Sequence, residues 1–248
     1  MPPVRIGTVD LPERIERERY FAELSYLELS ALFAGPLKPP SLSKWKEAPA
    51  HTLGLVVPWV LTQRKPPTAT RLWHHDAGVG DFRDSAHGRS ALTAFRDAAT
   101  TLSAAFAVFP SPALFAPSLA NRDRLKQFFG EVATEEAAGA RRVWVPDGLW
   151  EPRAAVKFAA ELGVVCAVDP LVYDPNSPEE VYEDLAAEAL YFRIGGLGRA
   201  GALRSEKLED LAGLVEHYEE IELTIAFASP ARWQDARNFK KLLEGAAS

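Results

Sequence analysis

The segment at residues 151–170, EPRAAVKFAAELGVVCAVDP, contains the pattern that decides the fold. Pro152 suits the first position of a helix, because its fixed φ fits the turn and its missing N–H needs no partner there. Apolar side chains then recur at spacings i, i+3, i+4 and i+7, which is one face of a helix, at Ala155, Phe158, Ala159 and Leu162. Gly163 follows and can take the left-handed conformation that ends a helix.

The same segment continues with an uninterrupted apolar run at residues 164–168. A strand that is apolar on both faces is typical of a parallel sheet covered by helices. Asp169 and Pro170 end the run. In α/β folds, a carboxylate at the carboxyl end of such a strand lies where ligands bind.

This helix–turn–strand unit repeats along the chain. Eight strands are predicted, at residues 4–9, 26–29, 52–57, 104–109, 141–145, 164–168, 190–194 and 221–227. Helices are predicted from residue 11, from Ser41 as a cap, at 91–102, 121–138 and 152–162, from residue 177, and at 207–218 and 231–243. The alternation predicts one α/β domain over residues 1–248, a (β/α)₈ TIM-like barrel of parallel strands with outer helices and a long loop at 62–89. A doubly wound open sheet is the alternative.

Composition limits the classes of function. The formal net charge is −6 with the two signs well mixed, which disfavours a dedicated nucleic-acid binder because such proteins carry a basic face. The single cysteine, Cys166, excludes an intramolecular disulfide, and its apolar neighbours predict a buried, unreactive thiol. No apolar run approaches the ~20 residues that span a bilayer, and no signal segment is recognised, so we expect a cytoplasmic protein without membrane contact.

Several short motifs follow one another in a recognisable order: Ile6-Gly7-Thr8, Leu27-Glu28-Leu29 through Phe33, Trp45, Pro58 through Thr62, Leu114-Phe115, Trp150, Asp169, Tyr191-Phe192-Arg193 and Ala236-Arg237-Asn238. Their order and spacing resemble the domain-of-unknown-function-72 (DUF72), or YecE-like, family of TIM barrels, over residues 4–243. The resemblance implies a barrel fold. We predict ligand-binding roles for Asp10, Asp147, Gly195, Gly196 and Asn238. The activity of that family is unsettled, and sugar-isomerase-like chemistry has served as an analogy for it.

The departures from the family pattern fall at the strand ends. Val9-Asp10 replaces the usual Gly-Trp, and Ser30-Ala31-Leu32 replaces a polar trio. The usual Arg-x-His-Gly reads Arg193-Ile194-Gly195-Gly196, without the histidine. Most of the site that the resemblance implies is therefore missing, and the chain is identified as a divergent member.

In a barrel, the strand ends converge on one rim, which would bring together Asp10, Glu28, Asp147, Asp169 and Arg193. Two nearby carboxylates can act as acid and base when their surroundings separate their pKa values. Carboxylate oxygens can also bind Mg²⁺, although no strong signal for a metal or another cofactor is present. The alternative is a structural ring in which Arg193 pairs with Glu28 or Asp169.

Two further motifs allow more than one interpretation. Gly196-x-Gly198-x-x-Gly201 formally matches a dinucleotide fingerprint, but the helix begins too late; a phosphate loop assisted by Arg193, Arg199 or Arg204 and a flexible turn are the other interpretations. His74-His75-Asp76, with His87, lies in the long loop. This group could bind a metal, fold over a ligand, or be solvated loop residues.

Two hypotheses of function follow. The favoured one is a catalytically degenerate barrel that binds a small anionic ligand or a protein partner. The alternative is an isomerase- or hydrolase-like enzyme on a sugar-like or phosphorylated molecule, with Glu28 and Asp169 as acid/base or Mg²⁺ ligands and Arg193 as an anion clamp. A rim plugged by Trp59, Trp150 and the long loop would favour binding, and a closed polar pocket would favour the enzyme.

Overall fold

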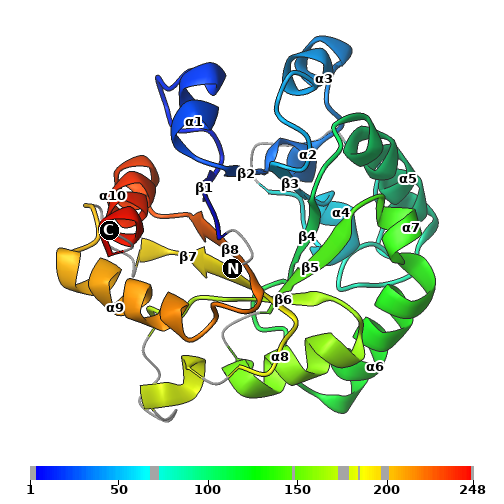
Figure 1. The fold of residues 1–248 in the computed structure, drawn as a ribbon. Coiled ribbons are helices and arrows are strands. Elements are labelled where there is room, and N and C mark those ends of the chain that lie inside the picture. Colours follow the sequence, from blue (N-terminus) through cyan, green and yellow to red (C-terminus); the bar gives the residue numbers. More distant parts are fainter. Residues whose placement is uncertain are drawn as a thin grey trace. The chain divides into compact units, whose positions relative to one another are not determined.

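The computed structural model describes residues 4–67, 73–146, 149–172, 179–183, 185–196 and 201–246. Its eight parallel strands form one closed barrel in chain order (Figure 1). The strands are β1 (Arg5–Val9), β2 (Tyr26–Leu29), β3 (Leu53–Val56), β4 (Phe106–Pro110), β5 (Arg141–Val145), β6 (Val165–Val168), β7 (Ala189–Ile194) and β8 (Glu222–Phe227). The predicted (β/α)₈ barrel is confirmed, and the open sheet is wrong.

Helical segments connect the strands. They are α1 (Arg17–Glu23), α2 (Ala31–Ala34), α3 (Pro39–Trp45), α4 (Trp59–Thr62), α5 (Ala86–Thr101), α6 (Leu119–Gln127), α7 (Glu135–Ala138), α8 (Pro152–Glu161), α9 (Ser205–Glu216) and α10 (Arg232–Ala246), with a π-helical turn η1 (Phe128–Val132) and a 3₁₀ turn η2 (Glu179–Tyr182). None of the helices within the described ranges is both long enough and apolar enough to cross a membrane.

Several helix predictions need correction, and among them the helix predicted from residue 11 begins only at Arg17. Residues 121–138 are not one helix: the chain passes from α6 into η1, and the Thr134 hydroxyl then accepts the N–H of Ala137 (3.2 Å) and caps α7 as a new helix. α3 begins at Pro39, not after Ser41, because proline suits the first turn. α5 begins at Ala86, since the Ser85 side chain accepts the Gly88 N–H (3.1 Å), so the irregular region is shorter than expected.

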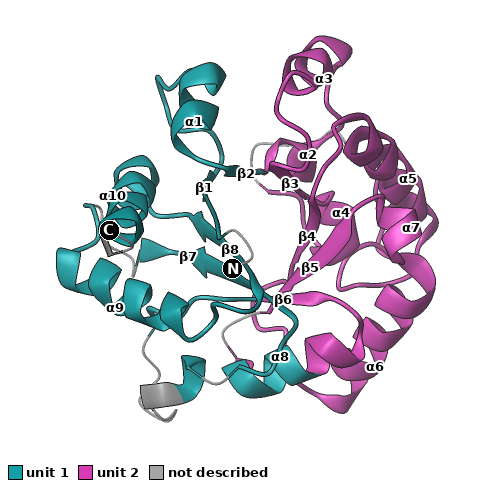
Figure 2. Cartoon of the chain, viewed as in Figure 1, with its two compact units in different colours: residues 1–28, 151–157, 167–248 teal, residues 29–150, 158–166 magenta. Residues whose placement is uncertain are grey.

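Close packing divides the chain into two compact units (Figure 2). Unit 1 comprises residues 1–28, 151–157 and 167–248, and unit 2 comprises residues 29–150 and 158–166. The division passes through α8 and β6. The single domain expected over residues 1–248 stays a prediction.

In unit 1, strand register decides which side chains share the barrel interior. Tyr191 of β7 pairs with Thr224 of β8, and Arg193 pairs with Ala226. Alternate residues of a strand point to the same face, so Tyr191 and Arg193 share one face of β7. Both contact Glu28 of β2, which is not a neighbour of β7 in the barrel order, so this face must be the interior.

In unit 2, aromatic side chains fill the core. Phe82, Phe109, Phe128 and Phe129 pack with ring centroids 5.2–6.0 Å apart. Two parts of the long loop are also bonded to neighbouring segments, since the Trp73 indole donates to the Leu32 carbonyl (3.1 Å) and the backbone N–H groups of residues 80–82 donate to α4 carbonyls.

Trp59 and Trp150, predicted from the sequence as residues that could block the rim, are core residues of unit 2. Trp59 packs in an apolar cluster with Trp73 and Ala91, and Trp150 stacks on Phe158 of α8 with centroids 5.5 Å apart. Trp150 therefore belongs to the layer between strand and helix, and not to the barrel interior.

Candidate functional site

Glu28 is the centre of the candidate site. It is the third residue of β2 and is 0% exposed. Its carboxylate accepts the Tyr191 hydroxyl (2.6 Å) and the Arg193 Nε (3.2 and 3.3 Å) and Nη2 (3.0 Å) groups. A carboxylate in an interior needs both a counter-charge and hydrogen-bond donors, and these two residues supply them.

A second tyrosine extends this network. The hydroxyl oxygens of Tyr26 and Tyr191 lie 2.9 Å apart, and both rings are fully buried. The Tyr191 hydroxyl donates its proton to Glu28. In the bond between the two tyrosines, Tyr26 is therefore the donor and the Tyr191 oxygen is the acceptor. Burial, and then the charge of Glu28, raise the pKa of both phenols well above 10, so both stay neutral. We call Tyr26, Glu28, Tyr191 and Arg193 the Glu28 cluster.

Arg193 connects this buried network to the outside. Its side chain is 31% exposed, and the carboxylate of Glu28 raises its pKa further above its already high ordinary value, so it stays charged. Its Nε and Nη2 groups are engaged with Glu28, whereas within the described part of the chain no hydrogen bond involves Nη1. One edge of the guanidinium, Nε and Nη2, is therefore bonded to Glu28. We call the other edge, Nη1 and the second N–H of Nη2, the open edge.

Asp169 follows β6 and is half-buried. Its carboxylate accepts the backbone N–H groups of Gly195 (2.7 Å) and Leu171 (3.1 Å). Burial raises the pKa of Asp169 above 3.8, although these two donors and the charge of Arg193 oppose the shift. The expected rim pair of Asp169 and Arg193 is thus close enough to interact electrostatically, while the direct ion pair of Arg193 is with Glu28.

Asp10 joins the ends of β1 and β2 through its backbone. Its N–H donates to the Glu28 carbonyl (2.7 Å), its carbonyl accepts the Thr8 hydroxyl (2.9 Å), and its φ is 58°. Of the predicted rim residues, Glu28 and Arg193 form an ion pair, Asp169 lies within electrostatic range of Arg193, and Asp10 contacts Glu28 through the backbone. Asp147 lies outside the described residues.

Gly196 and the end of β8 form a buried polar connection that the sequence did not indicate. Gly196 has φ +80°, and a Cβ there would lie 2.6 Å from Cβ of Ser229. The Ser229 hydroxyl donates to Asp235 Oδ2 (2.5 Å), and Asp235 Oδ1 accepts the Leu203 N–H (2.9 Å). Ser229 and Asp235 are fully buried, and an aspartate in the first turn of the helix after β8 was the signal that could have revealed them.

The remaining predicted positions lie elsewhere. Asn238 is exposed on α10, in a groove of about 400 Å³ that it shares with Leu208 of α9. His87, in the first turn of α5 and half-buried, lies 3.8 Å from Asp76, and its ring is 6.4 Å from that of His74; His74 and Asp76 are exposed on the loop before α5 in unit 2. Across the ranges that the structure describes, no group of three or more His, Cys, Asp or Glu residues could hold a metal ion.

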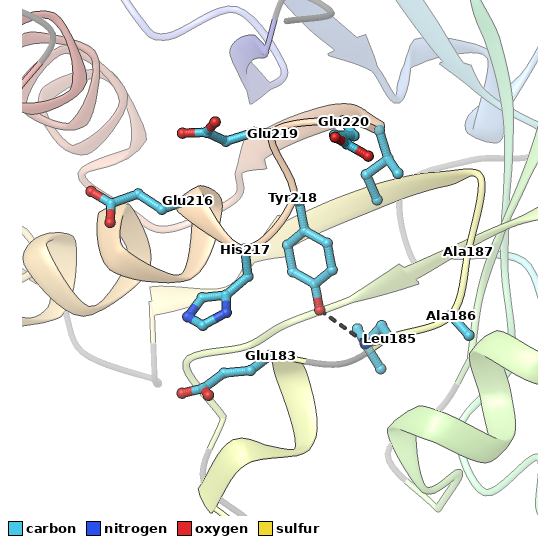
Figure 3. Close-up of a pocket in the computed structure, with 10 residues that line it drawn as sticks. Glu183, Leu185, Ala186, Ala187, Glu216, His217, Tyr218, Glu219 and Glu220 are labelled. Carbon is cyan, nitrogen blue, oxygen red and sulfur yellow. Dashed lines mark hydrogen bonds between the residues drawn. The ribbon is translucent and has the colours of Figure 1, made fainter.

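A second pocket of about 540 Å³ lies beside the segments that precede β7 and β8 (Figure 3). Glutamates and one histidine surround it, and Tyr218 closes one side by accepting the Leu185 N–H (3.1 Å) and donating to the Tyr182 carbonyl. These residues lie at the amino ends of the strands. In TIM barrels that end serves stability, whereas active sites lie at the carboxyl ends, where Arg193 and Asp169 are found.

No protein-family model matches the chain, and no curated protein sequence matches it. Solved structures do match its fold. A DUF72 family protein from Enterococcus faecalis V583 aligns with a TM-score of 0.69 and 14% sequence identity, over 98% of this chain and 96% of that chain. A DUF72 family protein from Thermotoga maritima MSB8 gives 0.63 and 15%, over 97% and 100%.

An L-ribulose 3-epimerase also aligns, with a TM-score of 0.63 and 16% identity over 99% of this chain and 96% of that chain. At such identities the likeness is one of fold. The chain therefore has the fold of the DUF72 proteins that its motifs resemble, and it shares this fold with a sugar epimerase.

Proposed function

We propose that the chain is a divergent barrel of the DUF72 type that binds a small anionic ligand at Arg193 and Asp169, and in which Glu28 no longer performs catalysis. The observation that carries the proposal is the open edge of Arg193, a permanently charged, partly exposed guanidinium at the carboxyl end of a barrel strand. Ligands of TIM barrels bind at that end.

The surroundings of Glu28 support a structural role for this carboxylate. Its oxygens already accept bonds from Tyr191 and Arg193, and none of its surface is exposed. A general base must reach the proton that it removes, within about 3 Å or through one water. Glu28 instead fixes the direction of the Arg193 guanidinium, and so prepares the open edge for a ligand.

A thermal-shift screen tests the proposal. Small carboxylates, phosphate esters and neutral sugars are added to the wild type and to Arg193→Lys, which keeps the charge beside Glu28 but loses the planar fork. We expect at least one anion to raise the melting temperature of the wild type, and a much smaller rise in the variant. An equal rise in both proteins, or none with any anion, contradicts an anion site at Arg193.

One observation favours an enzyme as the second candidate. The raised pKa of Asp169 makes it a possible proton donor at a strand end, and a sugar epimerase shares the fold. Turnover of ketoses by the wild type that disappears in Asp169→Asn would support this candidate. Turnover that survives in Asp169→Asn would remove Asp169 from the reaction.

A further inference from the structure

We propose that the anion at Arg193 is the carboxylate of a small hydroxy acid, and not a phosphate ester. This inference rests on the proposed function, because it specifies the chemistry of the ligand at the same site. Three features of unit 1 carry it: occupied backbone donors, a buried aspartate at the start of α10, and the geometry of the open guanidinium edge.

The first feature is the state of the donors at the ends of β7 and β8. Barrels hold phosphate with backbone N–H groups of the loops after strands seven and eight and with a helix N-terminus. Here the Gly195 N–H donates to Asp169 (2.7 Å), and the Leu203 N–H donates to Asp235 (2.9 Å). These two donors are thus occupied by carboxylates of the protein itself.

The second feature is the charge beside α10. Asp235 lies in the first turn of α10 and is fully buried, so it occupies the position where the helix dipole would attract a phosphate. The Ser229 hydroxyl, another possible phosphate donor, also donates to Asp235 (2.5 Å). A phosphate ester with a charge near −2 would meet the carboxylates of Asp169 and Glu28 beside Arg193.

The third feature is the match between a carboxylate and Arg193. The guanidinium is planar, and its uncommitted edge, formed by Nη1 and the second N–H of Nη2, can form two parallel bonds to one carboxylate. Glu28 already balances the arginine charge, so a single negative charge is better tolerated than two. A hydroxyl group of the ligand can then pair with Asp169, whose oxygens have lone pairs beyond the two backbone bonds.

Proton uptake follows from the same arrangement. Burial already raises the pKa of Asp169, and a carboxylate bound beside it would raise that pKa further, because a second negative charge disfavours the ionised form. A hydroxy acid should therefore bind more tightly as the pH falls toward the raised pKa of Asp169. Asp169→Asn should abolish this dependence.

Calorimetric titration with matched pairs of probes tests the inference. The pairs are glycerate against glycerol 3-phosphate, and gluconate against glucose 6-phosphate, each with the wild type, Arg193→Lys and Asp169→Asn. We expect one of the hydroxy acids to bind at least about ten-fold more tightly than its phosphate partner, and to lose about ten-fold in Arg193→Lys. Asp210→Asn, an exposed change on α9, is the control and should bind like the wild type.

The other outcomes separate the two claims. If a phosphate ester binds more tightly than its hydroxy acid and depends on Arg193, the carboxylate inference is wrong, while the anion site stands. If no probe binds, or if binding is the same in Arg193→Lys, the anion site and the inference both fall. Binding of a hydroxy acid that does not vary with pH contradicts the proton uptake assigned to Asp169.

Discussion

The Tyr191 hydroxyl donates a 2.6 Å hydrogen bond to Oε2 of Glu28, and so joins β7 to β2 across the interior of the barrel. Both residues are fully buried. The bond has a charged acceptor, so it should contribute more to stability than a bond between neutral groups. Together with Arg193 it lets an ionised carboxylate remain inside a barrel.

Tyr191→Phe should therefore lower the free energy of unfolding by about 1.5–3 kcal/mol, the range for hydrogen bonds to charged groups. The variant also removes the hydrogen bond between the Tyr26 and Tyr191 hydroxyls. Tyr218→Phe is the matched control, because the bonds of the Tyr218 hydroxyl to the Tyr182 carbonyl and the Leu185 N–H are with neutral backbone groups. Urea unfolding measures both, and a smaller loss in Tyr191→Phe than in Tyr218→Phe would refute the argument.

Removing the charge of Arg193 should also lower the free energy of unfolding, because Arg193 is the counter-charge of the buried Glu28. Arg193→Met leaves Glu28 buried without a counter-charge, which should destabilise the protein by about 3 kcal/mol, the low end for breaking a buried pair, because Arg193 is partly exposed. The double variant Glu28→Gln/Arg193→Met should recover part of that loss. A double variant whose loss equals the sum of the single losses would show that the two side chains are not coupled.

The change of the free energy of unfolding with pH should reflect the raised pKa of Asp169. Its pKa is raised in the folded state, so its contribution to stability is full below the unfolded value of 3.8 and is lost as the pH rises through the folded pKa. The stability of Asp169→Asn relative to the wild type should hence increase with pH over that range. Urea unfolding of both proteins at several pH values measures it. A difference that stays constant, or shrinks as the pH rises, would contradict the assigned shift.

Gly196→Ala should destabilise the protein by more than about 1 kcal/mol, since an alanine at φ +80° is strained and its Cβ would meet Ser229. Gly213→Ala, inside α9 with open space at the Cβ position, is the control and should gain up to about 1 kcal/mol. Thermal unfolding of both variants measures the two changes in stability. Equal effects would mean that the β7–α9 turn tolerates a side chain.

The strands were predictable because each is a short apolar run between breakers. Residues 26–29 and 141–145 were placed with the bounds that the structure has. The helix predicted over residues 121–138 was wrong because apolar periodicity reports one face and does not show that a π-helical turn and the Thr134 cap interrupt it. Periodicity predicts elements better than their ends.

The site was predictable only in part. Strand ends in a barrel converge, so the sequence indicated that Glu28 and Arg193 would meet, and they form an ion pair. Tyr191 was expected as a core residue, and its hydrogen bond to Glu28 depends on the register between strands that are distant in sequence. Asp235 was missed because its partners, Ser229 and Leu203, are brought to it only by the turns at the ends of β7 and β8.

A crystal structure of the chain grown with glycerate tests the central claim most directly, because it shows which atoms meet the anion. The carboxylate should lie about 3 Å from Nη1 and Nη2 of Arg193, with Glu28 still bound to Nε and a glycerate hydroxyl beside Asp169. Glycerate bound away from Arg193, or Nη1 occupied by another side chain of the protein, would contradict the proposed site.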